Sequence, residues 1–209
     1  MKHLLNLAFP KALALEADVA DGKKFLEHEH TYYVELEDLD QLKNAASMDM
    51  QEQWNVKLPK TETVGESSIR VRKIVEGDVN GGPNQKPEKE AQYVLTIKTE
   101  VGQQQRTEVP IPATQDAFEL FKALCSGGMI KHRYHFPVED GLVFEVDMYL
   151  NPEGGYYPFA KIDLEVNNNT GEIPEIPLKL KSCINGDSEN AKDRETIRSY
   201  YSDYFLTKK

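Results

Sequence analysis

Two alternating segments decide the fold of this chain. They lie within residues 141–165, which read GLVFEVDMYLNPEGGYYPFAKIDLE. Glu145 and Asp147 alternate with apolar residues in the first segment, and Lys161 and Asp163 do so in the second. Because successive side chains of a strand point to opposite faces, residues two positions apart share a face. The stretch therefore predicts two strands that are apolar on one face and carry charges of both signs on the other.

Similar charged positions recur in the other alternating segments of the chain. The acidic candidates for the charged face are Glu27, Glu29, Glu108, Glu145, Asp147, Asp163 and Glu165. The basic candidates are Arg70, Arg72, Lys98, Arg106, Lys131, Arg133 and Lys161. A buried ion costs several kcal/mol to desolvate even when it is paired, so a dry interior would not tolerate so many. We expect an enclosed, charged interior that is wet or is completed by a ligand.

Eight segments have the composition and alternation of strands, and turn-forming residues join several of them. These segments are 27–34, 53–58, 67–74, 93–99, 104–111, 129–137, 142–150 and 156–166. Closing such strands into a barrel removes the sheet edges and creates an interior. The expected fold class is α+β, mainly antiparallel β: an eight-stranded closed or nearly closed β-barrel, or tunnel, with helices packed outside.

Three helices are expected around this barrel. Asp38 is positioned to cap a short helix, and Thr114 to cap a longer one that ends at Gly127 or Gly128. Residues 193–207 carry aromatic and aliphatic side chains at helical spacing, which predicts a C-terminal helix on an outer face of the sheet.

Length and charge set limits on the organisation and partners of the chain. Its 209 residues suit one domain, which we place at residues 25–209, after an N-terminal extension of residues 1–24. The net charge of -10 argues against binding to duplex nucleic acid or to an anionic membrane, since basic patches supply that affinity. No stretch approaches the roughly 18 apolar residues of a membrane helix. The two cysteines, Cys125 and Cys183, are expected to be free thiols in a cytoplasmic protein.

Both signs of charge in one cavity suit a metal–polyphosphate complex. Arginine and lysine match phosphate oxygens, and arginine does so with two parallel hydrogen bonds. Carboxylates beside them match Mg²⁺ or Mn²⁺, which bind carboxylate, water and phosphate oxygens together.

The order of these motifs resembles that of the CYTH superfamily, also called triphosphate tunnel metalloenzymes, which includes class IV adenylate cyclases, thiamine triphosphatases and inorganic triphosphatases. The similar pieces are Glu27-His-Glu29-His-Thr31, Ile69-Arg70-Val71-Arg72, Leu95-Thr96-Ile97-Lys98, Arg106-Thr-Glu108, Lys131-His-Arg133, Phe144-Glu145-Val146-Asp147 and Lys161-Ile-Asp163-Leu-Glu165. They run in family order from Glu27 to Glu165.

The resemblance implies a Mg²⁺- or Mn²⁺-dependent hydrolase that acts on tripolyphosphate, a nucleoside triphosphate or another organic triphosphate; cyclase activity is the less favoured variant. It also makes a homodimer plausible. The substrate-binding residues that it implies are Arg70, Arg72, Lys98, Arg106, Lys131, Arg133 and Lys161. The metal ligands that it implies are Glu27, Glu29, Glu145, Asp147, Asp163 and Glu165. The catalytic residues that it implies are Glu29, Lys98 and Arg133.

Two residues depart from the family pattern. Thr31 stands where the opening signature has lysine, and Lys161 stands where the late Glu-x-Glu motif has its first acid. One interpretation is that Lys161 replaces the lost lysine across the cavity; another is that Asp163 and Glu165 restore two acids in a shifted register. The departures leave open an alternative function, a protein that binds or sequesters a phosphorylated ligand without turnover, and also a purely structural role.

Overall fold

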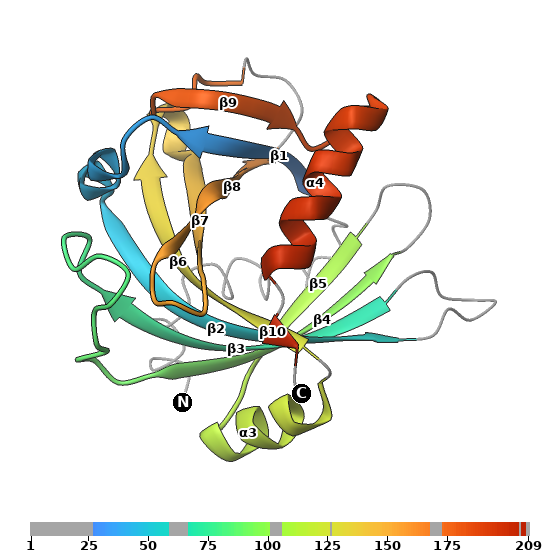
Figure 1. The fold of residues 1–209 in the computed structure, drawn as a ribbon. Coiled ribbons are helices and arrows are strands. Elements are labelled where there is room, and N and C mark those ends of the chain that lie inside the picture. Colours follow the sequence, from blue (N-terminus) through green and yellow to red (C-terminus); the bar gives the residue numbers. More distant parts are fainter. Residues whose placement is uncertain are drawn as a thin grey trace.

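The computed structural model describes residues 27–58, 67–100, 106–125, 127–167, 173–204 and 206–207. The expected N-terminal extension, residues 1–24, lies outside the described residues. Within them, one strongly curved antiparallel sheet forms the body of the molecule, with a few helices around it (Figure 1). The expected class, mainly antiparallel β with some helix, is confirmed.

Ten strands make up the sheet. They are β1 (Glu27–Leu36), β2 (Ser47–Leu58), β3 (Ser67–Gly77), β4 (Gln92–Glu100), β5 (Arg106–Pro112), β6 (Gly127–Pro137), β7 (Val143–Leu150), β8 (Tyr156–Asn167), β9 (Leu180–Asn185) and β10 (Leu206–Thr207). All eight expected strands are present. The sequence pattern does not predict β9 or β10, because β9 is largely exposed and lacks a buried apolar alternation and β10 is only two residues long.

Hydrogen bonds do not close the sheet in the described part of the chain. The strand order is β5-β4-β3-β2-β6-β7-β8-β1-β9, with β10 paired to β6, and the described ladders do not join β5 to β9. The closed form of the expected barrel is therefore wrong for these residues. β9 takes the free side of β1, so the edge on that side is a short, mostly exposed strand that has little apolar surface to bury against β5.

The main hydrophobic core lies on the outer, convex face of the sheet. Its members include Val34, Tyr134, Phe144, Ile162 and Leu164, all 2% exposed or less. The short 3-10 helix η1 (Leu39–Asn44) contributes to this core, and the Asp38 carboxylate caps it as expected, accepting a 2.9 Å hydrogen bond from the Asp40 amide. The outer face of the strands is thus apolar, which leaves the opposite face to the charged residues.

Helix α3 (Gln115–Leu124) packs on the outside of the sheet, as expected, where Phe118 joins Trp54 in a second apolar cluster. The Thr114 hydroxyl caps it by accepting a 3.2 Å hydrogen bond from the Ala117 amide. The predicted end at Gly127 or Gly128 is wrong. The helix stops at Leu124 because the chain turns to extended backbone and both glycines belong to β6.

Helix α4 (Ala191–Tyr204) lies on the concave side of the sheet, not on an outer face (Figure 1). The ring of Tyr200 stacks on that of Phe159, with centroids 3.8 Å apart, and Phe159 shares its face of β8 with Lys161 and Asp163. The helix also ends earlier than the predicted residue 207. The physical reason for its position is the aromatic end of the concave face, where Phe159 clusters with Tyr149 and other apolar side chains.

Candidate functional site: a charged network on the concave face

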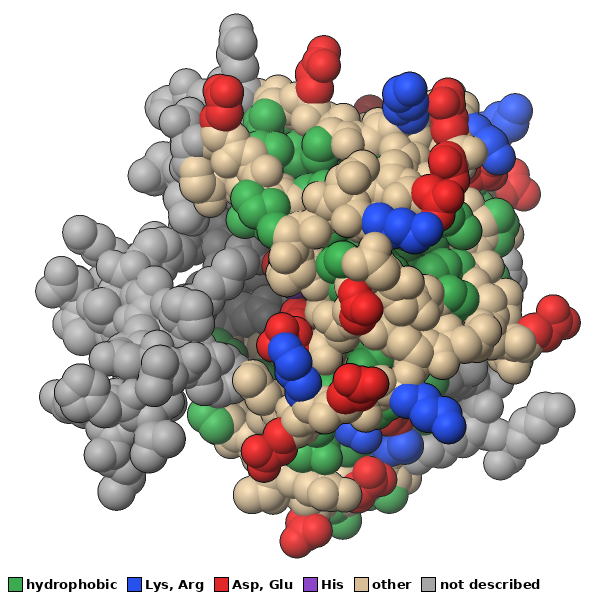
Figure 2. Space-filling view, turned by 90° about the vertical axis from the view of Figure 1, so that its left-hand side faces the viewer, with side chains coloured by type: hydrophobic (Ala, Val, Ile, Leu, Met, Phe, Trp, Pro, Cys, Tyr) green, Lys and Arg blue, Asp and Glu red, His purple; other side chains and the backbone are tan. Residues whose placement is uncertain are grey.

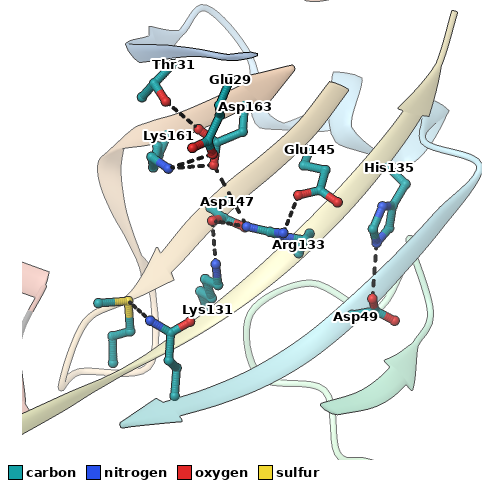
Figure 3. A network of polar contacts seen from close by, with 12 residues as sticks. Glu29, Thr31, Asp49, Lys131, Arg133, His135, Glu145, Asp147, Lys161 and Asp163 are labelled. Atoms are coloured by element: carbon teal, nitrogen blue, oxygen red, sulfur yellow. Dashed lines mark hydrogen bonds and ion pairs between the residues drawn. The ribbon is translucent and has the colours of Figure 1, made fainter. Parts of the chain in front are cut away.

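The ladders bring charged residues from four strands onto one face. Asp147 of β7 lies opposite Arg133 of β6 and opposite Lys161 of β8. Thr31 of β1 lies opposite Asp163 of β8. Directly opposed residues of an antiparallel pair point to the same face, so these side chains meet on the concave side. Figure 3 shows them pointing toward one another from β1, β6, β7 and β8.

The centre of this network is the buried carboxylate of Asp147, which is 1% exposed. Lys131 Nζ donates to its Oδ2 at 2.5 Å. Arg133 donates from Nε to Oδ1 at 2.7 Å and from Nη2 to Oδ2 at 2.8 Å, a two-pronged contact. Arg133 also forms an ion pair with Glu145. Two cations and two carboxylates therefore neutralise one another at the centre of the concave face.

The charges at this centre shift the pKa values of its members. Burial by itself raises the pKa of Asp147, but the charges of Arg133 and Lys131 outweigh it and hold that pKa well below the usual range. Burial, aided by the positive charge of Arg133, lowers the pKa of Lys131 to about 7 against the opposing effect of Asp147. Asp147 is therefore ionised at neutral pH, and its negative charge opposes the loss of the proton from Lys131.

The two departures from the family pattern meet at a single carboxylate, Asp163. The Thr31 hydroxyl donates to Asp163 Oδ1 at 2.8 Å, and Lys161 Nζ donates to Oδ2 at 2.5 Å. Lys161 Nζ also lies 3.7 Å from Glu29 Oε1. Arg133 Nη2, 3.9 Å from Asp163 Oδ2, connects this group to the Asp147 centre. Burial by itself lowers the pKa of Lys161, but Asp163 and then Glu29 raise it above its ordinary value, so Lys161 is charged.

A second set of basic positions begins on the same face two strands from β6, on the other side of β2. Arg70 and Arg72 of β3 lie opposite Asn55 and Gln53 of β2, which in turn share the face of Lys131 through the β2–β6 ladder. By register, the same face of β4 and β5 carries the positions Lys98, Arg106 and Glu108. The side chains of those three residues, and of Glu27 and Glu165, lie outside the described residues, so only their backbone placement is known.

The structure places some of the site residues predicted from the sequence in direct contact and others farther apart on the same face. The structure brings together Glu29, Lys131, Arg133, Glu145, Asp147, Lys161 and Asp163 in one bonded network. It places Arg70 and Arg72 on the same face but on the other side of β2. The roles of all these residues in binding or catalysis stay predictions.

A group of neutral polar residues on the concave face was not predicted from the sequence. The side-chain oxygens of Gln51, Gln53 and Thr96 are buried and have no hydrogen-bond partner among the described residues. Gln51 and Gln53 on β2 lie between the two charged groups, and Thr96 on β4 lies opposite Arg70. Buried polar atoms are normally satisfied, so this unsatisfied set marks a place for water or a ligand. A search for alternating charges does not find them, although residues 49, 51 and 53 alternate with apolar or outward positions in the same way.

The described side chains do not fit a divalent metal ion. Among the described residues, no group of three His, Cys, Asp or Glu side chains is arranged to hold one. Asp147 and Asp163 each accept bonds from cationic groups on this chain. A divalent ion about 4 Å from an ammonium group would be repelled by about 8 kcal/mol at an effective dielectric constant of about 20. The four expected metal ligands whose side chains are described, Glu29, Glu145, Asp147 and Asp163, therefore do not form a metal site by themselves. The roles of Glu27 and Glu165 stay predictions, because their side chains lie outside the described residues.

Comparisons with known proteins find no matching family model and no matching curated protein. Among solved structures, the chain is similar to the inorganic triphosphatase NE1496 at 18% identity, with 80% of this chain and 91% of that chain covered and a TM-score of 0.43. It is also similar to the PH1819 protein of Pyrococcus horikoshii OT3, at 14% identity, 87% and 95% coverage and a TM-score of 0.43. A third match is HpAC1 of Hippeastrum, a putative adenylyl cyclase with a dominant triphosphatase activity, at 10% identity, 87% and 90% coverage and a TM-score of 0.40.

At identities and TM-scores this low, the activities of those proteins do not carry over to this chain. Among the described helices, none is both long and apolar enough to cross a membrane.

Proposed function

We propose that the concave face binds a polyphosphate anion of the triphosphate class. The observation that carries this proposal is the register of β3, β4 and β5, which puts the basic positions Arg70, Arg72, Lys98 and Arg106 on one face with Glu108 as the only acid among these motif positions. The carboxylates of the described network lie instead on β1, β7 and β8. By register, Glu100 lies opposite Arg106 and Glu108 lies opposite Lys98, so the basic excess on this side of the concave face comes from Arg70 and Arg72. The described network on the other side is close to charge balance.

The chemistry of the basic side suits phosphate oxygens. Guanidinium groups such as those of Arg70 and Arg72 bind phosphate with two parallel hydrogen bonds. The buried Thr96 hydroxyl on the neighbouring strand β4 supplies a neutral donor. The Gln51 and Gln53 side-chain oxygens on β2 are acceptors and suit water molecules around the anion. An extended anion with several phosphate groups would reach from the arginines on β3 toward Lys131 on β6.

The order of the sequence motifs and their register on one face together support a divergent membership of the CYTH superfamily. One further observation favours a second function, metal-dependent hydrolysis of the bound polyphosphate. Glu29 lies opposite Glu165 in the β1–β8 ladder, and Glu27 shares their face two residues away. Three acidic positions thus gather at the end of this ladder, and they would hold Mg²⁺ or Mn²⁺ only together with the phosphate oxygens of a bound ligand. Such an ion would neutralise phosphate charge and supply a Lewis acid for hydrolysis of the terminal phosphate.

Binding is tested by titrating the full chain with tripolyphosphate and following its melting temperature. A ligand that binds only the folded state stabilises it by RT ln(1 + [L]/Kd), about 2.7 kcal/mol at one hundred times Kd. Arg72→Gln is expected to weaken binding about tenfold, since it removes a charge-assisted contact. The matched control is Arg198→Gln on the exposed side of α4, which should bind as the wild type does. Equal affinity in Arg72→Gln and the wild type would contradict the proposal.

Hydrolysis is tested separately, by phosphate release from tripolyphosphate and ATP with Mg²⁺ or Mn²⁺. Metal-dependent release that collapses in Glu29→Gln would establish the second function. Binding without release under either metal would leave the chain as a polyphosphate-binding protein.

A further inference from the structure

The ammonium group of Lys161 stands between two carboxylates of neighbouring strands. It lies 2.5 Å from Asp163 Oδ2 and 3.7 Å from Glu29 Oε1. The side chains of Lys161 and Asp163 are 18% and 2% exposed, so little water screens the contact between them. Glu29 is 41% exposed, so its contact with Lys161 is the weaker one. Lys161 thus occupies the place between two carboxylates, and carboxylate pairs are common ligands of Mg²⁺.

Both oxygens of Asp163 are engaged by the chain itself. Lys161 binds one, and the Thr31 hydroxyl donates to the other. Thr31 can do this because it lies directly opposite Asp163 in the β1–β8 ladder. A neutral hydroxyl at this position adds no positive charge beside the ammonium group, so the two side chains are compatible around one carboxylate.

The charges of the whole described network are close to balance without a metal. Three cations, Lys131, Arg133 and Lys161, are bonded to four carboxylates, Glu29, Glu145, Asp147 and Asp163. A divalent ion added to the Glu29–Asp163 pair would face Lys161 directly and Arg133 just beyond it.

We propose that Lys161 is the resident cation of the Glu29–Asp163 pair and excludes a divalent ion from it. The consequence for the ligand, which rests on the function proposed above, is that tripolyphosphate binds to this chain without a divalent metal. Lys161 and Thr31 act together: the lysine supplies the cation, and the threonine holds the carboxylate toward it.

The first test measures Mn²⁺ binding to the ligand-free full chain by electron paramagnetic resonance of the free ion. The wild type and Lys161→Arg, which keeps the charge, are expected to bind Mn²⁺ weakly and alike. Lys161→Glu is expected to bind one Mn²⁺ at least about tenfold more tightly, because it replaces the cation by a third acid. Lys161→Gln, which is neutral and similar in size, should gain in the same direction and serves if Lys161→Glu does not fold. The proposal is overturned if neither Lys161→Glu nor Lys161→Gln binds Mn²⁺ more tightly than the wild type does.

The second test measures tripolyphosphate affinity in a chelator and in Mg²⁺. The wild-type affinity in chelator is expected to stay within about threefold of that in Mg²⁺. A loss of about tenfold or more in chelator would refute the metal-independent mode. If no tripolyphosphate binds under either condition, the proposed function fails, while the Mn²⁺ comparison still decides the role of Lys161.

Discussion

Asp163 shows at the level of single residues how two unusual positions depend on each other. Thr31 and Lys161 are far apart in the sequence, and each removes a group that the family pattern contains. The ladder makes Thr31 the direct neighbour of Asp163, and Lys161 lies two residues before Asp163 on the same face. Thr31 and Lys161 therefore meet at the same acid, Asp163. That Lys161 replaces the lysine missing from β1 stays a hypothesis.

A residue-scale prediction concerns Asp147, whose removal leaves Lys131 and Arg133 as buried cations without their main partner. Asp147→Asn keeps the size of the side chain but not its charge, and it is expected to lower the free energy of unfolding by about 3 kcal/mol. Urea denaturation followed by circular dichroism gives this value.

The matched control for this prediction is Glu76→Gln. Glu76 forms an exposed ion pair with Lys89, with both side chains about 60% exposed, so its loss should cost no more than about 1 kcal/mol. Similar costs for the two variants would mean that burial adds nothing to the Asp147 ion pairs.

Strand β6 is the element on which the site depends most, since it carries Lys131 and Arg133 and pairs with β2, β7 and β10. Near its beginning, at Gly128, β6 lies against β2 with no room for a side chain. A Cβ atom on Gly128 would lie 2.5 Å from Trp54 Cδ2 and 2.6 Å from the Gln53 backbone oxygen. The glycine is therefore needed for close approach of two strands, and not to end helix α3.

The element-scale prediction is that Gly128→Ala disrupts the β2–β6 pairing. Because part of the clash is with backbone, which cannot move aside cheaply, the free energy of unfolding should fall by about 2 kcal/mol or more. Hydrogen exchange should show the largest loss of protection in β2 and β6.

Gly155→Ala is the control, because the atom nearest to its new Cβ would be Asn151 Nδ2, a side-chain atom at 3.3 Å, which is ordinary to slightly tight packing. It should cost less than about 1 kcal/mol. Unchanged protection in β6 of Gly128→Ala would show that the strands can separate without penalty.

In the whole molecule, the charged network lies on the concave face of the sheet and the main hydrophobic core lies on its outer face. On the outer surface of the molecule that Figure 2 shows, acidic and basic side chains are interspersed, with hydrophobic side chains between them. His132 is buried on the side of the main core, and its Nδ1 is 2.7 Å from the Tyr156 hydroxyl. Burial lowers the pKa of His132 to about 4 from its usual value of 6.5, so the core holds the neutral ring.

The prediction for the whole molecule is a loss of stability between pH 6.5 and pH 4 that depends on His132. The unfolded chain takes up a proton below about pH 6.5 that the folded chain accepts only near pH 4, so the stabilisation present above pH 6.5 is lost as the pH falls. The shift corresponds to about 3 kcal/mol at most. Urea titrations at several pH values should show this loss in the wild type and a clearly smaller one in His132→Gln.

His30→Gln on β1 leaves His132 in place and serves as the control, with the wild-type pH dependence expected. If His132→Gln is as acid-sensitive as the wild type, another group causes the loss.

Much of the fold was accessible from sequence because strand alternation is a local property. The eight expected strands and the caps Asp38 and Thr114 depend on neighbouring residues only, and the structure confirms them. Strand β9 was not accessible, since its exposed residues carry no apolar period. The position of α4 was not accessible either, because its aromatic stripe shows that it packs but not on which face of the sheet.

The alternation along each segment is enough to show which side chains share a face of a strand, and it predicts one apolar and one charged surface. The tertiary structure alone decided which charges neutralise one another, because strand order and register depend on contacts between residues distant in the chain. Only there does Asp147 become the partner of Lys131 and Arg133, and only there do Thr31 and Lys161 meet on Asp163. Alternation needs only a period of two, whereas a site needs several strands in register at once.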